Sequence, residues 1–250
     1  MSLTLPFDAG AYRFVPGVFQ YSAGVGAMPG YRIVRVRFHE TVPLAQGFAV
    51  AKSIIVAASR PLTAFCACEL RSPAPFDEAG FRSFNELYVG TLSDWGLFDG
   101  STNPVARSNV CPEIDPPMEP SFHAFAYTEP APNAAPSFIV AGSGEAPEGT
   151  ATYRDHVIRL GDTGADGLRE KARFVLGEME KRLGALGSTW QDTTAVQVYT
   201  VHDLYPFLAD EIVRRGAARS GLTWHFNRPP VESLDYEMDC RGVAIEKVVS

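Results

Sequence analysis

The sequence predicts an α+β fold of two similar units, each with β-β-α-β-α-β-β order and its helices on one face of a sheet. The prediction rests on paired features: two glycine-rich strand ends, two long amphipathic helices, and two copies of an Ala-Arg-Ser and Pro-Pro-x-Glu pair. Hydrophobic residues make up 46% and charged residues 20% of the 250. This composition is typical of a globular chain and excludes a disordered or fibrous one.

Each unit begins with a strand that runs into a glycine-rich turn, at 19–26 and at 138–144. A long helix follows in both. Between 44 and 58, and again between 168 and 183, apolar residues recur at steps of three and four, which places them on one helical face. Each helix is therefore expected to bury one stripe and expose the rest.

The remaining elements are again matched between the units. A strand follows each long helix, and a second helix is expected after Asp77 and after Asp203, each a plausible N-cap. The strands predicted in these parts of the chain are 64–70, 193–201, 122–127 and 236–241. The first unit also has an extra loop at 93–102.

The unit boundaries follow from composition. The first domain is expected at 1–128, a Pro- and Ala-rich linker at 129–136, and the second domain at 137–250. Arg35 and Arg37 alternate with apolar neighbours in the first unit, as Glu237 and Asp239 do in the second. A sheet with such a mixed face is expected to pack against another sheet around a polar cleft.

Charge and cysteine content limit the partners and the compartment. The net charge is −7, which gives no electrostatic footprint for nucleic acid. Four cysteines are too few for a disulfide framework and suggest reduced thiols in the cytoplasm. No apolar run is long enough to span a bilayer, and the first residues do not resemble an export signal, so we expect a soluble cytoplasmic protein.

Four short segments of the first half carry a family resemblance: Gly10-Ala11-Tyr12, Pro16-Gly17-Val18, Ser22-Ala23-Gly24 and Asn103-Pro104-Val105-Ala106-Arg107-Ser108. With them the chain resembles, over nearly its whole length, the RidA/YjgF superfamily, which includes enamine/imine deaminases, aminomuconate deaminases and proteins labelled L-PSP endoribonucleases. The second half, from Phe138 to Glu246, is the better overall match in element order. The chain thus resembles a tandem, two-domain member.

The resemblance implies a chorismate-mutase-like fold, trimers of single domains, and active clefts between neighbouring subunits. It also implies roles for side chains. Arg107 and Arg219 match the arginine that binds the substrate carboxylate, and Tyr12 matches an N-terminal tyrosine. Glu237 or Asp239 falls near the acid on the last strand. Neither half keeps tyrosine, arginine and acid together, so either the halves complement each other or one site is inactive.

The chemistry of these side chains suits an acid substrate, although each also has a structural interpretation. A guanidinium binds a carboxylate through two parallel hydrogen bonds, yet Arg107 is also compatible with a surface ion pair and Arg219 with a helix C-terminus. Glu237 and Asp239 share a strand face and offer either a proton shuttle or a solvated edge. His123, near the acid's position in the first half, offers an acid/base group or a packed ring. Tyr12 either donates to the substrate or packs near the N-terminus.

The sequence indicates neither a metal nor a cofactor. Cys66 and Cys68 share a strand face but have no partner pair for zinc, so they are expected to be buried thiols. The glycine runs lack the Lys-Ser/Thr that a phosphate loop needs.

The function predicted from the sequence is a hydrolytic deaminase. It would convert a small enamine or imine carboxylic acid, 2-aminomuconate-like or a 2-imino acid, to the oxo-acid and ammonia, with the carboxylate held by arginine. A non-catalytic small-molecule binding protein and, third, an endoribonuclease remain the alternatives. The expected partners are a small carboxylate and other copies of the chain in a homotrimer, with no nucleic acid and no membrane.

Overall fold

The strands of the protein form two sheets. The computed structural model describes residues 4–149 and 153–250. One sheet has six strands, in the order β11 (Asn227–Arg228), β6 (Ala106–Pro112), β5 (Phe65–Arg71), β7 (Ser121–Pro130), β4 (Tyr31–Pro43) and β13 (Ile245–Val249). The other has seven, in the order β1 (Leu5–Phe7), β2 (Tyr12–Val15), β3 (Gly24–Ala27), β8 (Phe138–Gly144), β12 (Glu237–Gly242), β9 (Ala195–Tyr199) and β10 (Thr223–His225).

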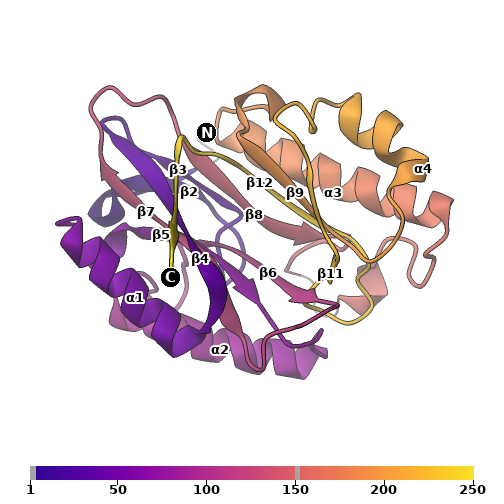
Figure 1. The fold of residues 1–250 in the computed structure, drawn as a ribbon, viewed down its shortest axis with the longest axis horizontal. Coiled ribbons are helices and arrows are strands. Elements are labelled where there is room, and N and C mark those ends of the chain that lie inside the picture. Colours follow the sequence, from indigo (N-terminus) through magenta and orange to yellow (C-terminus); the bar gives the residue numbers. More distant parts are fainter. Residues whose placement is uncertain (1–3, 150–152) are drawn as a thin grey trace.

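The helices lie on the outer sides of the two sheets, so that the strands occupy the middle of the molecule (Figure 1). α1 (Leu44–Ala57) and α2 (Glu78–Asp94) lie on the side of the six-stranded sheet. α3 (Ala165–Ala185) and the short α4 (Tyr205–Phe207) lie on the side of the seven-stranded sheet. The chain is therefore an α+β protein with its helices outside and its sheets facing each other.

Four strands in each sheet have the same order and directions. In β6-β5-β7-β4 the first pair is parallel and the other two pairs are antiparallel. The strands β10-β9-β12-β8 repeat this pattern, with β10 and β9 parallel. The two halves of the sequence thus contribute equivalent four-stranded cores.

Each sheet also takes strands from the other half of the sequence, which the sequence analysis did not anticipate. β3 pairs with β8, so β1, β2 and β3 extend the sheet of the second half. In return, β13 pairs in parallel with β4, and β11 pairs with β6. These additions cover strand edges that would otherwise leave backbone N–H and C=O groups unpaired.

The predicted helices form close to their expected positions. The Asp77 carboxylate accepts a hydrogen bond from the Gly80 N–H (2.6 Å), which confirms it as the N-cap of α2. The second helix of the second half is shorter than expected: α4 has three residues and continues as the π-helical turn Leu208–Val213. Gly216, with a φ of 92°, then turns the chain away.

The core on the α1–α2 side is rich in aromatic rings. Phe65 stacks on Phe125 with centroids 6.1 Å apart, and Phe48 meets Phe122 edge to face at 4.9 Å. Trp95, at the end of α2, meets Phe48 at 5.3 Å. The burial of these rings fixes the two helices against the six-stranded sheet.

The two sheets meet through charged side chains as well as apolar ones. Arg35 donates two hydrogen bonds to Glu69, at 2.6 and 2.7 Å, and both side chains are buried. Glu246 of β13 accepts from Arg35 (3.1 Å) and from Arg241 of β12 (2.6 Å). The sheets thus pack together through the predicted mixed faces, and some of the charges on these faces pair with each other.

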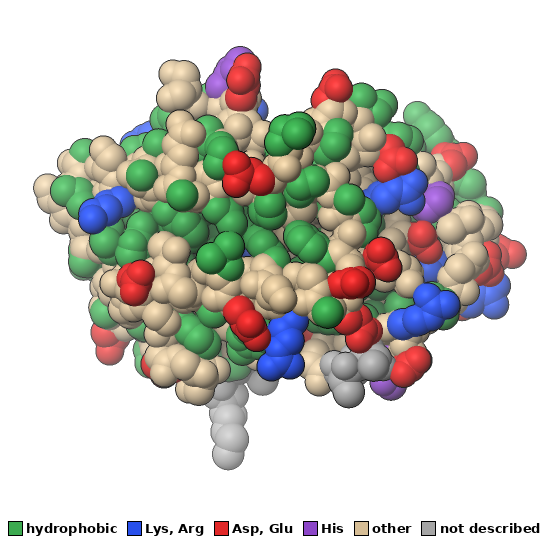
Figure 2. Space-filling view, turned by 90° about the horizontal axis from the view of Figure 1, so that it is seen from below, with side chains coloured by type: hydrophobic (Ala, Val, Ile, Leu, Met, Phe, Trp, Pro, Cys, Tyr) green, Lys and Arg blue, Asp and Glu red, His purple; other side chains and the backbone are tan. Residues whose placement is uncertain are grey.

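The outer surfaces of the helices differ in charge. α1 carries one charged residue, Lys52, and leaves Val56 exposed. Figure 2 shows the molecule from below, with hydrophobic side chains spread over the left and middle of this face and more charged ones to the right.

In the described ranges, 4–149 and 153–250, no helix has the length and apolar character needed to cross a bilayer.

The close packing of α1 on β7 gives a stability prediction. A side chain at Gly47 would overlap the ring of Phe122, so Gly47→Ala is expected to lower the free energy of unfolding by about 1–3 kcal/mol.

Gly90 lies on the exposed side of α2 and offers a contrast. No atom lies within 4 Å of the position that an added methyl group would take, so Gly90→Ala should raise the free energy of unfolding by about 0.5–1 kcal/mol.

Urea denaturation of both variants and the parent protein measures these changes. Equal stability of Gly47→Ala and the parent would show that α1 does not pack this closely on β7.

Candidate functional site

A cavity lies where β6 packs against β8, at the meeting of the two sheets. Its volume is about 40 Å³, and we call it the Arg107 cavity. Its lining residues come from both halves of the chain: Tyr21, Phe81, Arg107, Asn109, Gly142, Gly144, Ala146, Glu148, Tyr153, Pro230, Val231, Leu234 and Glu237. The site is thus shared between the halves.

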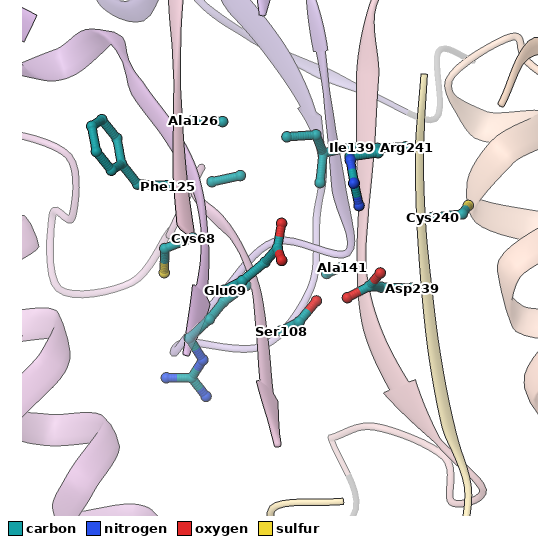
Figure 3. A pocket seen from close by; sticks show the side chains of 12 residues that line it. Cys68, Glu69, Ser108, Phe125, Ala126, Ile139, Ala141, Asp239, Cys240 and Arg241 are labelled. Carbon is teal, nitrogen blue, oxygen red and sulfur yellow. The ribbon is translucent and has the colours of Figure 1, made fainter. Parts of the chain in front are cut away.

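A second, smaller hollow lies between the facing sheets and also touches Arg107. We call it the inter-sheet hollow. Figure 3 shows Glu69 and Ser108 from one sheet and Asp239 from the other directed into this space. Arg107 therefore lies between a polar interior and the cavity.

Arg107 is a buried cation that stacks on aromatic rings. It is 3% exposed, and its guanidinium carbon lies 4.9–5.8 Å from four ring centroids. The four rings belong to Tyr21, Phe81, Phe84 and Tyr88. Ring faces attract a cation but do not accept its N–H groups as an oxygen does. In the described part of the chain the Nη1 atom of Arg107 has no hydrogen-bond partner. An unpaired buried donor of this kind suits an anionic ligand.

Local structure explains how Arg107 reaches this position. β6 pairs in parallel with β5, with Arg107 beside Cys68, and α2 supplies three of the four rings. The fourth ring, Tyr21, is placed by Ser22, whose N–H and hydroxyl donate to the carbonyls of Val105 (2.9 Å) and Pro104 (3.1 Å). The segment before β3 is thus fastened to the start of β6.

Glu237 faces the same cavity from β12. It is 4% exposed, and its carboxyl occupies space beside Gly142, where any side chain would overlap Oε1. Burial, and then the nearby carboxyls of Asp239, Glu145 and Glu148, raise the pKa of Glu237 well above its usual value, while Arg107 opposes the change. These surroundings therefore favour the protonated, uncharged form of Glu237.

Asp239 lies two residues further along β12 but faces the inter-sheet hollow. A β-bulge between Met238 and Cys240 shifts the pairing of β12 with β8 at this point. The Tyr199 hydroxyl donates to the Asp239 carboxylate (2.9 Å), and burial, with the neighbouring Glu69, raises the pKa of Asp239 to about 6. The two acids expected on one face thus serve different spaces.

The other three predicted site residues lie outside the Arg107 cavity. Tyr12 is fully buried, and its hydroxyl donates to the Phe65 carbonyl (3.3 Å). Arg219 is exposed, and its Nη1 donates to the Gln191 carbonyl (3.3 Å). It lies in the turn before β10, which also contains Gly221 with a φ of 96°, whereas Arg107 lies within β6.

His123 lies on β7, near a different cluster of side chains. Its ring is 6.4 Å from that of His225, and burial, followed by the charge of Arg71, lowers the pKa of His123 to about 3. The ring is therefore uncharged near neutral pH. The structure brings together Arg107 and Glu237 of the predicted site residues, with Asp239 in the adjoining hollow.

Several cavity residues were missed by the sequence analysis. Tyr21 directly precedes the Ser22 segment, and Asn109 follows Arg107 at the spacing that keeps two residues on one strand face, so both had a usable signal. Glu148 and Tyr153 come from the loop after β8, which carries no motif. Arg182 of α3 binds Glu148 (2.7 Å), and Tyr21 donates to the same carboxylate (3.0 Å).

The described residues offer no donor set for a metal: among 4–149 and 153–250, no three His, Cys, Asp or Glu side chains converge for one. Cys66 and Cys68 are buried free thiols. Burial raises the pKa of Cys68 to about 12, so this sulfur is a protonated thiol rather than a metal-binding thiolate.

Comparison with solved structures gives distant likenesses. A chorismatase covers 88% of this chain and 77% of its own, at 13% identity and a TM-score of 0.49. The YjgF gene product of E. coli covers 43% of this chain and 80% of its own, at 16% identity and a TM-score of 0.32. Likenesses at this level say nothing about activity.

Comparison of sequences gives a close relationship. The family model "2-aminomuconate deaminase CnbZ" matches residues 4–247. The 2-amino-5-chloromuconate deaminase of Comamonas testosteroni is 51% identical over 245 residues, which is 97% of this chain and 98% of the relative. Both matches include the segments that supply Arg107 and Glu237. The chain therefore belongs to the CnbZ family of 2-aminomuconate deaminases.

Proposed function

We propose that the protein is a hydrolytic deaminase of 2-aminomuconate-like acids, which converts an enamine or imine carboxylic acid and water to the oxo-acid and ammonia. The family membership supports the reaction and substrate class. The observation that carries the proposal in the structure is the buried Arg107 guanidinium, which has an unpartnered donor and lines a cavity together with Glu237, an acid whose pKa is raised.

Arg107 anchors the substrate in this proposal. Its fork-shaped guanidinium gives a carboxylate two charge-assisted hydrogen bonds, which an ammonium group cannot match in geometry. The rings of Tyr21, Phe84 and Tyr88 restrict the guanidinium, so the anchored acid is held in one orientation. The carbon that bears nitrogen is next to that carboxylate and is thereby positioned for reaction.

Glu237 moves the protons. As an acid it donates a proton to the enamine carbon, which gives an iminium ion and leaves a carboxylate. That carboxylate accepts a proton from water as the water oxygen bonds to the iminium carbon. Glu237 then gives this proton to nitrogen and, as the C–N bond breaks, accepts the proton of the new hydroxyl group, so that the C=O forms, ammonia and the oxo-acid leave, and Glu237 is protonated again. The sum is substrate plus water to oxo-acid plus ammonia, and a raised pKa suits both proton steps.

We also propose that the chain is a tandem of two RidA-like units, at 1–128 and 137–250, joined by the linker 129–136. The equal order of β6-β5-β7-β4 and β10-β9-β12-β8 supports this proposal. One working cavity per chain then combines an arginine from the first unit with an acid from the second. The homotrimer and the cytoplasmic location stay predictions from the sequence.

The first prediction about activity concerns Arg107, the proposed carboxylate anchor. Arg107→Ala is expected to lower kcat/KM for 2-aminomuconate by roughly a hundred- to ten-thousand-fold, because it removes two hydrogen bonds to a charged group. Arg107→Lys should recover only part of the loss, since it keeps the charge without the fork. The rate of ammonia release from freshly prepared 2-aminomuconate gives kcat/KM for both variants.

Arg214→Ala is the matched control, because Arg214 is an exposed arginine paired with Asp210 on the surface. Full activity of Arg107→Ala would refute the assignment of the anchor. Tight binding of the acid by the parent protein without any turnover would favour a non-catalytic binding protein instead.

The second prediction concerns pH. The active form carries protonated Glu237, so kcat/KM should be constant at low pH and fall as pH rises through the raised pKa of this residue. Glu237→Gln cannot release a proton, so it should lose most activity and the alkaline decline together. A pH profile of ammonia release for both proteins tests this. If kcat/KM of Glu237→Gln still declines at high pH as in the parent protein, another group causes that decline.

A further inference from the structure

One donor in the Arg107 cavity is not used by the reaction proposed above. Asn109 lies two residues after Arg107 on β6, lines the same cavity and is 3% exposed. Its Nδ2 atom has no hydrogen-bond partner in the described part of the chain. A buried amide nitrogen without a partner loses its hydrogen bonds to water on folding and gains none in return.

The orientation of this amide is set by a neighbour. The Ser72 hydroxyl donates to the Oδ1 atom of Asn109 (3.0 Å), and the Ser72 N–H donates to the Val110 carbonyl (2.9 Å). Because Oδ1 is occupied by a donor fastened to the same strand, the amide nitrogen is the group left over. It presents N–H groups, so its ligand must supply an acceptor oxygen.

The anchored carboxylate does not need this donor. The guanidinium of Arg107 can satisfy both oxygens of one carboxylate. A 2-aminomuconate-like acid has a second carboxylate at the other end of a six-carbon chain. The sequence analysis expected Arg219 to bind an acid, but Arg219 is on the surface and donates to Gln191. Arg107 is the one Lys or Arg among the described residues that line the cavity, so a neutral donor is left for the second carboxylate.

We propose that Asn109 is a specificity-determining residue, whose amide N–H binds the distal carboxylate of the dicarboxylic substrate while Arg107 binds the carboxylate next to the amino group. The inference rests on the function proposed above. It predicts that the cavity distinguishes six-carbon diacids from monoacids of the same length through one hydrogen bond.

Two dienoic acids provide a matched pair of probes. trans,trans-Muconate has a carboxylate at both ends of a six-carbon diene, and sorbate has a methyl group in place of one of them. Calorimetric dissociation constants are measured for the parent protein, Asn109→Asp, Asn109→Ala and Asn85→Asp. Asn85, on α2, is a buried asparagine outside the cavity lining and also has an unpartnered side-chain atom, so it controls for the chemical change itself.

The parent protein is expected to prefer muconate to sorbate by roughly tenfold or more. Asn109→Asp places a negative charge opposite the distal carboxylate and should lose this preference, with muconate binding weakened roughly ten- to a hundredfold and sorbate binding little changed. Asn109→Ala removes the donor without adding a charge, so it should lose the preference for muconate without repelling it. This variant tests the inference if Asn109→Asp does not fold. Asn85→Asp should keep the preference.

With 2-aminomuconate as substrate, the same Asn109 variants should raise KM more than they lower kcat, because the distal contact is equally present before and during reaction. An unchanged preference for muconate in both Asn109 variants would overturn the inference and leave the proposed function intact. Equal weakening of muconate and sorbate would also overturn it, since the donor would then serve the shared carboxylate. Absence of ammonia release from the parent protein would instead refute the proposed function.

Discussion

The site depends on the close approach of β6 and β8. Gly142 has no side chain, so the β8 backbone comes near the Cα atom of Ser108 and leaves space for the Glu237 carboxyl. A side chain here would push the sheets apart and displace the carboxyl. The approach of Arg107 in one half to Glu237 in the other therefore depends on a glycine at position 142.

Arg107 shows how the fold accommodates a buried charge that has no carboxylate partner. Two other buried cations have carboxylate partners: Arg35 binds Glu69 between the sheets, and Lys171 of α3 binds Glu145 at 3.1 Å. Such pairs offset much of the cost of removing ions from water. Arg107 has ring faces around it instead, which attract its charge and leave a donor open. The protein thus leaves a buried cation with an open donor where we propose that an acid binds.

Sequence patterns predicted the local elements better than their assembly. The apolar spacing of α1 and α3 and the Asp77 cap depend on neighbours in the chain, and they formed as expected. The pairing of β13 with β4 depends on which edges are open in three dimensions, and no local pattern reports that. Likewise Arg107 and Arg219 have the same flanking residues, Ala and Ser, but Arg107 lies inside a strand and Arg219 in a turn. The extra residue of β8 opposite Met238–Cys240 was equally invisible to strict alternation.

The exchange of strands between the halves bears on how the chain reaches its folded state. β4 receives its outer neighbour β13 from residues about two hundred positions later, and β8 receives β3 from the opposite direction. Contacts of such long sequence separation close large loops and slow folding. During synthesis the edge of β4 stays unpaired until β13 has been made. Maturation of the two halves is therefore expected to be a single concerted event rather than two successive ones.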